Sequence, residues 1–293
     1  MYDMSAFYEA DSVQAAIALR MAHPEAQIIA GGSDVLVQMR EGKRAGASLI
    51  SIYGIDALRG VSLDEDGTLR IGSLTSFSHI TRDPLIQRCC NVLGEAVDQV
   101  GGPQIRNIGT IGGNTCNGVT SADSAATLFA YDAIIELTGP AGVRLQPIGD
   151  FYLKAGVVDL REGELQTAIL IPKESYENTF GNYIKYAMRS AMDIATLGCS
   201  VNLRLSADGK TVSRARIAYG VAGPIPMRCP HAEALAENQT LSPELAERFA
   251  AAVTEDIHPR SSWRASADFR MHIAVESAKR AFLEAAKLAG GVL

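Results

Sequence analysis

The stretch "AGGSDVL", residues 30–36, sets two adjacent glycines between an apolar run and small polar side chains. Residues 27–29, directly before it, read "QII" and predict a short buried strand. Gly31 and Gly32 can adopt positive φ and can bring consecutive backbone N–H groups together at one anion. The stretch is therefore typical either of a tight turn or of a backbone that approaches a phosphate.

A second stretch of the same kind reads "GTIGGN", residues 109–114. It repeats the apolar lead-in, the paired Gly112 and Gly113, and small polar residues, here Thr110 and Asn114. Two such loops could bind a pyrophosphate from opposite sides. The hydroxyl and amide groups of the small polar residues would add hydrogen-bond donors without bulk. Neither loop matches the G-x-G-x-x-G or G-x-x-x-x-G-K-[ST] signature. Spacing alone leaves two interpretations open: ordinary glycine turns, or a phosphate or nucleotide site.

Composition describes an ordinary globular protein. The 293 residues are enough for about two domains, and 47% are hydrophobic while 20% are charged. A net charge of −6 argues against a general affinity for nucleic acid or anionic membranes. The first twenty residues lack the pattern of a signal peptide, and no apolar run approaches the length of a bilayer span. We expect a cytoplasmic protein.

Cysteine and histidine spacing predicts no metal centre in this chain. The five cysteines, at positions 89, 90, 116, 199 and 229, form no C-x-x-C pair or zinc pattern, and their odd number argues against a disulfide framework. We expect most of them to be small buried residues. The five histidines lack spacings such as H-E-x-x-H. An iron–sulfur cluster is therefore not expected here.

Hydrophobic periodicity predicts a mixed first half and an antiparallel second half. Strands are predicted near 48–52, 68–74, 133–137 and 165–172. Helices are predicted over 83–100 and over 121–132, the second capped by Ser121. The polar residues 173–182 predict a domain boundary. Beyond them, three strand patterns precede three helical ones.

Further segments carry a resemblance to a known family. They read "IIAGGSDVL" (28–36), "LRIGSLTSFSHI" (69–80), "GPQIRNIGTIGGNTCNG" (102–118), "YAMRSAMDIATLGCSVNL" (186–203), "RIAYGVAGPIPMRC" (216–229) and "PRSSWRASADFR" (259–270). Over nearly its whole length the sequence resembles the FAD subunit of molybdenum hydroxylases, the family of xanthine dehydrogenase, aldehyde oxidase and carbon monoxide dehydrogenase. The likeness is greatest to the flavin subunit of bacterial three-subunit xanthine dehydrogenases.

The resemblance implies an α+β fold with two domains. Residues 1–175 would form a two-lobed FAD-binding domain of the vanillyl-alcohol-oxidase type, with lobes of about 1–55 and 56–175. Residues 176–293 would form an α/β C-terminal domain with a small antiparallel sheet and helices.

The resemblance also implies a set of FAD-binding residues. Residues 27–34 and 109–114 would hold the pyrophosphate and ribityl chain, Leu165 would border the flavin, and Asp123 and Lys185 would lie near the cofactor. The whole set is Gln27, Ile28, Ile29, Ala30, Gly31, Gly32, Ser33, Asp34, Gly109, Thr110, Ile111, Gly112, Gly113, Asn114, Asp123, Leu165 and Lys185.

Two positions depart from the family pattern. Ser33 replaces a threonine common in relatives, and Val100 replaces an aromatic residue that stacks on FAD in some eukaryotic relatives. Neither Cys116 nor any histidine presents a covalent flavin attachment motif, so we expect non-covalent FAD.

Several of these residues have a second interpretation. Lys185 is either an exposed lysine or a cation at the flavin N1/O2 edge, which would stabilise reduced flavin. Asp123 can also be an acid at a helix start. Arg106 is either a phosphate ligand or a surface arginine paired with an acid. Trp263 is either a contact for a partner chain or a buried residue at a helix start.

The absence of cluster cysteines fits the resemblance, which implies one subunit of a complex. Electrons would leave the substrate at a molybdopterin-binding large subunit and pass through [2Fe-2S] clusters on a small subunit. They would then reach FAD on this chain and go to NAD⁺ or another acceptor. Xanthine is the expected substrate. The alternatives are the flavin subunit of a hydroxylase for an aldehyde, aromatic acid, nicotinate or carbon monoxide, or a non-catalytic nucleotide-binding assembly module.

Overall fold

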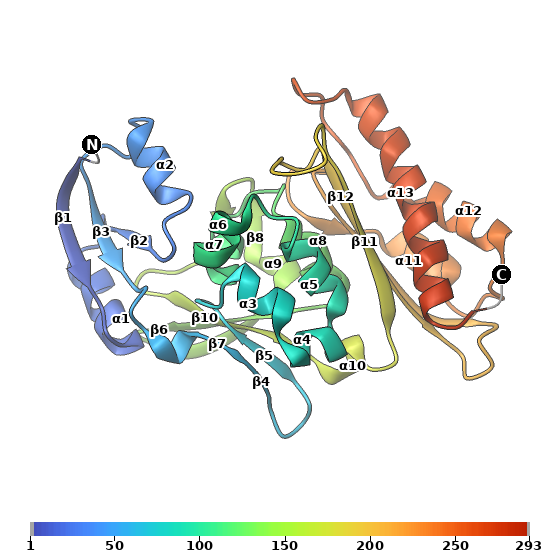
Figure 1. The fold of residues 1–293 in the computed structure, drawn as a ribbon, viewed down its shortest axis with the longest axis horizontal. Coiled ribbons are helices and arrows are strands. Elements are labelled where there is room, and N and C mark those ends of the chain that lie inside the picture. The colour runs from blue at the N-terminus through green and yellow to red at the C-terminus, as the bar shows by residue number, and fades with distance from the viewer. Residues whose placement is uncertain (1–2, 292–293) are drawn as a thin grey trace.

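The computed structural model describes residues 3–291 and has three main sheets in a row, joined by helices (Figure 1). The N-terminal lobe lies at one end, a larger central part carries most of the short helices, and the C-terminal helices cover the far sheet. The fold is a mixture of helices and mostly antiparallel sheets, as the sequence predicts. Within residues 3–291 no helix has both the length and the apolar character needed to cross a bilayer.

The N-terminal lobe is a parallel sheet of three strands in the order β1-β3-β2. Ser12 caps its first helix by accepting a hydrogen bond from the N–H of Ala15. Its elements are β1 (Met4–Glu9), α1 (Val13–Ala22), β2 (Gln27–Ile29), α2 (Val35–Arg40) and β3 (Ala47–Ser51), followed by a 3₁₀ turn at Asp56–Leu58.

The central part is an antiparallel sheet of five strands in the order β4-β5-β10-β6-β7. Every residue of β10 is buried, because this strand pairs with β5 on one side and β6 on the other. The sheet comprises β4 (Val61–Leu63), β5 (Leu69–Gly72), β6 (Ile134–Gly139), β7 (Gly142–Pro147) and β10 (Leu165–Ile171). A hairpin of β8 (Tyr152–Lys154) and β9 (Val157–Val158) adds a small separate sheet.

Short helices cover this central sheet, and α5 and α8 lie between it and the C-terminal sheet (Figure 1). They are α3 (Phe77–Arg82), α4 (Pro84–Cys89), α5 (Asn91–Val97), α6 (Pro103–Ile108), α7 (Ile111–Cys116), α8 (Asp123–Ala130), α9 (Ile148–Phe151) and α10 (Lys173–Tyr176).

The helix predicted over 83–100 is two helices, α4 and α5. Cys90 leaves the helical conformation, at φ −145° and ψ 47°, and its side chain is fully buried. The break turns both helices so that their apolar sides enter one core. The cap predicted at Ser121 is also wrong: α8 begins at Asp123, and no side chain caps it.

The C-terminal part is an antiparallel sheet in the order β11-β12-β13-β14, covered on one side by helices. The long helix α13 packs on β11 and β12, and α11 packs on β13. The elements are β11 (Phe180–Tyr186), β12 (Leu197–Leu205), β13 (Val212–Gly220), β14 (Met227–Arg228), α11 (Pro230–Ala236), α12 (Pro243–Ala252), a 3₁₀ turn (Val253–Glu255) and α13 (Ala267–Leu288).

Two further expectations concern single residue types. Four cysteines are buried and Cys116 is half-buried, which confirms their role as small packing residues. Trp263 is 76% exposed and lies 4.2 Å from the guanidinium of Arg264, so the buried alternative for this tryptophan is wrong. A partner contact at Trp263 stays a prediction.

We predict that the ion pair between Arg70 and Glu136 makes stability depend on pH. Arg70 Nη1 and Nη2 lie 2.6 and 2.7 Å from the two carboxylate oxygens, and this contact lowers the pKa of Glu136. A lowered folded-state pKa stabilises the fold above the unfolded pKa of about 4.3, and that contribution disappears as pH falls through the folded value. Arg70→Met should therefore cost about 1 kcal/mol at pH 7 and less below pH 4.

Urea unfolding between pH 3 and 7 measures this difference, with the exposed Arg88→Met as the control. A deficit of Arg70→Met that stays constant across the pH range would contradict the assignment.

Candidate functional site

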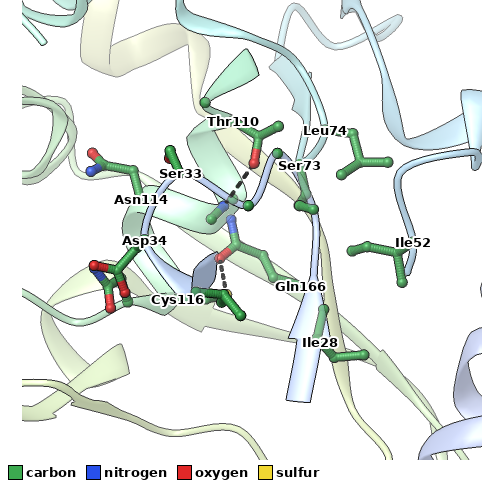
Figure 2. A pocket seen from close by; sticks show the side chains of 18 of the residues that line it. Ile28, Ser33, Asp34, Ile52, Ser73, Leu74, Thr110, Asn114, Cys116 and Gln166 are labelled. Carbon is green, nitrogen blue, oxygen red and sulfur yellow. Dashed lines mark hydrogen bonds between the residues drawn. The ribbon is translucent and has the colours of Figure 1, made fainter. Parts of the chain in front are cut away.

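A cavity of about 410 Å³ lies where the N-terminal lobe faces the central part (Figure 2). Both glycine stretches line it. Its lining residues are Arg20, Gln27, Ile28, Ala30, Gly31, Gly32, Ser33, Asp34, Val35, Gln38, Arg44, Ile52, Ser73, Leu74, Phe77, Val100, Ile105, Gly109, Thr110, Gly112, Gly113, Asn114, Cys116, Asn117, Gly156, Leu160, Glu164, Leu165 and Gln166.

The first stretch connects β2 to α2 and lies against Ile108, the residue directly before the second stretch. A Cβ added to Gly31 would lie 1.8 Å from the carbonyl oxygen of Ile108, so only glycine allows this approach. Gly32 has φ +73°, which side chains other than glycine rarely adopt. Among residues 3–291, the backbone N–H groups of Gly31 to Asp34 have no hydrogen-bond acceptor. This loop therefore offers a row of donors at the cavity.

The second stretch forms the short helix α7 instead of the expected open loop. Its N–H groups are already used: Ile111 donates to Thr75, Gly112 to Ser73, and Gly113 to the hydroxyl of Thr110. A Cβ on Gly112 would lie 2.6 Å from Cβ of Ser73. The paired glycines here allow close packing of α7 on the strand below, and the expectation of converging N–H groups holds only for the first stretch.

Three buried polar atoms of the cavity lining have no hydrogen-bond partner among the described residues: Arg20 Nε, Ser73 Oγ and Gln166 Nε2. An unpaired buried donor is costly, and a ligand in the cavity that accepted a hydrogen bond from it would remove that cost. Arg44 also lines the cavity, where its guanidinium lies 2.5 Å from both Gln38 Oε1 and Gln27 Oε1. Two arginines and several unpaired donors therefore fit a polar, anionic ligand.

Most of the predicted binding residues meet at this cavity, but four do not line it. Ile29 and Ile111 point into apolar cores next to it. Asp123 and Lys185 form a buried ion pair behind it, with Nζ and Oδ2 2.7 Å apart and side chains 6–7% exposed. The exposed alternative for Lys185 is thereby wrong.

The ion pair is tied to the cavity wall. Lys185 Nζ lies 2.9 Å from the carbonyl oxygen of Gln99, next to the lining residue Val100, and Tyr183 donates to Asp123 Oδ1 at 2.9 Å. Burial raises the pKa of Asp123, although Lys185 and Tyr183 favour its ionised form. A cofactor contact from either residue of the ion pair stays a prediction.

Arg106 takes its second interpretation, an arginine paired with an acid, and His79 also has an acidic partner. Arg106 Nε lies 3.1 Å from Asp98, and its Nη1 donates to the carbonyls of Val100 and Gly101. His79 is exposed and lies 3.2 Å from Asp83. Val100 lines the cavity, so the missing aromatic would have faced it.

Sequence reasoning missed the lining residues that come from other strands and helices, above all Arg20, Arg44, Ser73 and Gln166. Ser73 lies within a segment that resembles the family, and Gln166 directly follows the predicted Leu165. The two arginines carry no local pattern, because their role depends only on how the lobes meet.

Comparison with known proteins defines the class. Residues 3–174 match the family model described as FAD binding domain in molybdopterin dehydrogenase. Residues 182–285 match that of the CO dehydrogenase flavoprotein C-terminal domain. The two-lobed fold with its glycine-lined cavity is thus that of an FAD-binding flavoprotein.

Individual relatives give the same result. The chain is 43% identical to the putative xanthine dehydrogenase FAD-binding subunit of Escherichia coli K12 over 293 residues, the whole of both chains. It is 31% identical to the carbon monoxide dehydrogenase medium chain of Hydrogenophaga pseudoflava, over 88% of each chain. The solved structure of carbon monoxide dehydrogenase from that organism superposes with a TM-score of 0.92 over 99% of both chains. This chain belongs to the FAD-binding medium subunits of the molybdenum hydroxylase family.

Proposed function

We propose that the cavity between the lobes holds the FAD, with residues 1–175 as the FAD-binding domain and 176–293 as the C-terminal domain. The observation that carries this proposal is the row of unpaired N–H groups from Gly31 to Asp34, facing a cavity lined by Arg20 and Arg44. Backbone donors in such a row bind anionic oxygens, and arginine matches phosphate geometry. Thr110, Asn114 and Leu165 line the same cavity and complete the contact surface.

We propose further that this chain works in a complex with a molybdopterin-binding large subunit and a small [2Fe-2S] subunit. The chain would receive electrons from the iron–sulfur clusters and deliver them to NAD⁺, with xanthine as the substrate of the complex. FAD, when bound, supplies the exchange between single electrons and electron pairs. The similarity to xanthine dehydrogenase subunits over the whole chain supports this choice.

Other substrates have support among more distant relatives. A carbon monoxide dehydrogenase medium chain and a nicotinate dehydrogenase FAD subunit share 31% and 28% identity with this chain. The cavity residues do not favour any one substrate, because substrate chemistry belongs to the large subunit.

The test is anaerobic spectroscopy of the complex purified with its partner subunits. Xanthine should bleach the flavin absorbance, and NAD⁺ should restore it with formation of NADH. Aldehyde, nicotinate and carbon monoxide serve as competing substrates, and oxygen and a redox dye serve as competing acceptors. A complex without flavin would overturn the binding proposal. Flavin bleached by another substrate but not by xanthine would overturn the choice of substrate, and restoration by oxygen or dye but not by NAD⁺ would overturn the choice of acceptor.

A further inference from the structure

Ser73 and Gln166 lie side by side on the floor of the cavity. Ser73 directly follows β5, and its N–H donates to the carbonyl of Thr167 on β10, at 3.1 Å. Gln166 precedes Thr167 on the same strand. The two residues are 3% and 4% exposed and line the cavity, as Figure 2 shows.

The carboxamide of Gln166 is held by its oxygen. Thr115 Oγ1 lies 2.7 Å and Cys116 Sγ 3.1 Å from Gln166 Oε1. Burial raises the pKa of the Cys116 thiol to about 12, so the thiol keeps its proton and acts as a donor. Both contacts therefore anchor Oε1 and leave Nε2 without a partner within residues 3–291.

Neither Nε2 of Gln166 nor Oγ of Ser73 has a partner among the described residues, and neither atom is in contact with water. Desolvated donors of this kind cost stability unless a bound molecule pairs them. The first glycine stretch would contact the ligand through its free backbone N–H groups, whereas these two groups are neutral side-chain donors at a different pair of strands.

We propose that Ser73 and Gln166 are cofactor-recognition residues: a small rotation of each side chain would turn its buried donor into the cavity, where it would donate a hydrogen bond to the bound FAD, with Thr115 and Cys116 as positioning residues for Gln166. The inference rests on the proposed location of FAD in this cavity. It adds specificity determinants that the glycine loops do not supply. A side-chain donor on the cavity floor favours a ligand that has a hydrogen-bond acceptor at that one place.

The test compares FAD affinity with the stability of the FAD-free protein. Ser73→Ala and Gln166→Met remove the unpaired donors at nearly constant shape. Each should weaken FAD binding about three- to tenfold, and the double variant about 30-fold. The melting temperature of FAD-free Ser73→Ala should not fall, because the change removes an unsatisfied buried group. Gln166→Met also removes the acceptor of Thr115 and Cys116, so its FAD-free melting temperature should fall slightly. Thr115 keeps the carbonyls of Ile111 and Gly112 as acceptors, at 3.2 and 3.1 Å.

Titration of FAD by flavin fluorescence gives the affinity, and differential scanning calorimetry gives the melting temperatures. The exposed Ser213→Ala and Gln104→Met are the matched controls. A fall in the melting temperature of FAD-free Ser73→Ala would show a structural role for Ser73 and overturn the proposal. So would variants that bind FAD as tightly as the wild type. Wild-type protein that binds no FAD would instead refute the proposed function.

Gln166→Glu tests which end of the carboxamide faces the ligand. This change replaces Nε2 by an oxygen that accepts hydrogen bonds, so binding should weaken at least as much as in Gln166→Met. If Gln166→Glu binds FAD as tightly as the wild type, the protein does not need to donate a hydrogen bond at this position. That result would overturn the assignment of Nε2 as a donor to FAD.

Discussion

Gly31→Ala should abolish the retention of FAD during purification and lower the free energy of unfolding by about 3 kcal/mol. The added Cβ would lie 1.8 Å from the carbonyl oxygen of Ile108 and 2.7 Å from its carbonyl carbon. Both overlapping atoms belong to the backbone of Ile108, so no side-chain rotamer can relieve the overlap, and the first glycine stretch must move away from the segment that leads into the second. The separation would move the free N–H groups of the first stretch out of line with the second.

The measurements are the flavin-to-protein absorbance ratio of the purified protein and its unfolding in urea. Gly149→Ala is the matched control, because its Cβ would meet no atom within 4 Å and its φ is not positive. A Gly31→Ala protein that keeps stoichiometric FAD would show that the contact between the two stretches is not needed for binding.

Lys185→Met should destabilise the fold by about 3–5 kcal/mol at pH 7. The change leaves the carboxylate of Asp123 buried, at 7% side-chain exposure, with only the hydroxyl of Tyr183 to pair it. Burial already raises the pKa of Asp123, and loss of the ammonium group raises it further. A raised folded-state pKa penalises the ionised form, so the deficit should be small near pH 4 and should grow as pH rises.

Chemical denaturation at several pH values checks this prediction. The double variant Asp123→Asn with Lys185→Met should recover most of the loss, because no charge remains buried. Lys173→Met breaks an ion pair with Glu177 whose side chains are 52% and 51% exposed, and should change stability by less than about 0.5 kcal/mol. Equal losses in Lys185→Met and Lys173→Met would contradict the importance of burial.

Local patterns predicted much of the fold. Strands such as β3 and β10 and the helix α13 follow from apolar periodicity. The structure adds a cap to α13, where the hydroxyl of Ser266 accepts a hydrogen bond from the N–H of Phe269. The apolar pattern predicted the wrong element where packing into the core required a break in the helix. Residues 83–100 are apolar enough for one helix, but Cys90 breaks the run so that two short helices can face the same core.

The candidate site was also predicted only in part from the sequence. The sequence indicated both glycine stretches, and the structure brings Gly32 and Gly113 to one cavity. It also indicated Asp123 and Lys185, which join in an ion pair behind the wall instead of lining it. Which of these residues contact FAD stays a prediction until the cofactor is titrated against the variants above.

The sequence by itself determined the mixed fold, the two glycine stretches and the family, because these depend on local residue order. Only the tertiary structure decided which N–H groups are free. Gly31 to Asp34 keep theirs unpaired, whereas those of Ile111, Gly112 and Gly113 are consumed by Thr75, Ser73 and Thr110. Hydrogen-bond pairing between distant segments depends on how the lobes meet, and no spacing along the chain records it. The unpaired donors of Ser73 and Gln166 became visible for the same reason.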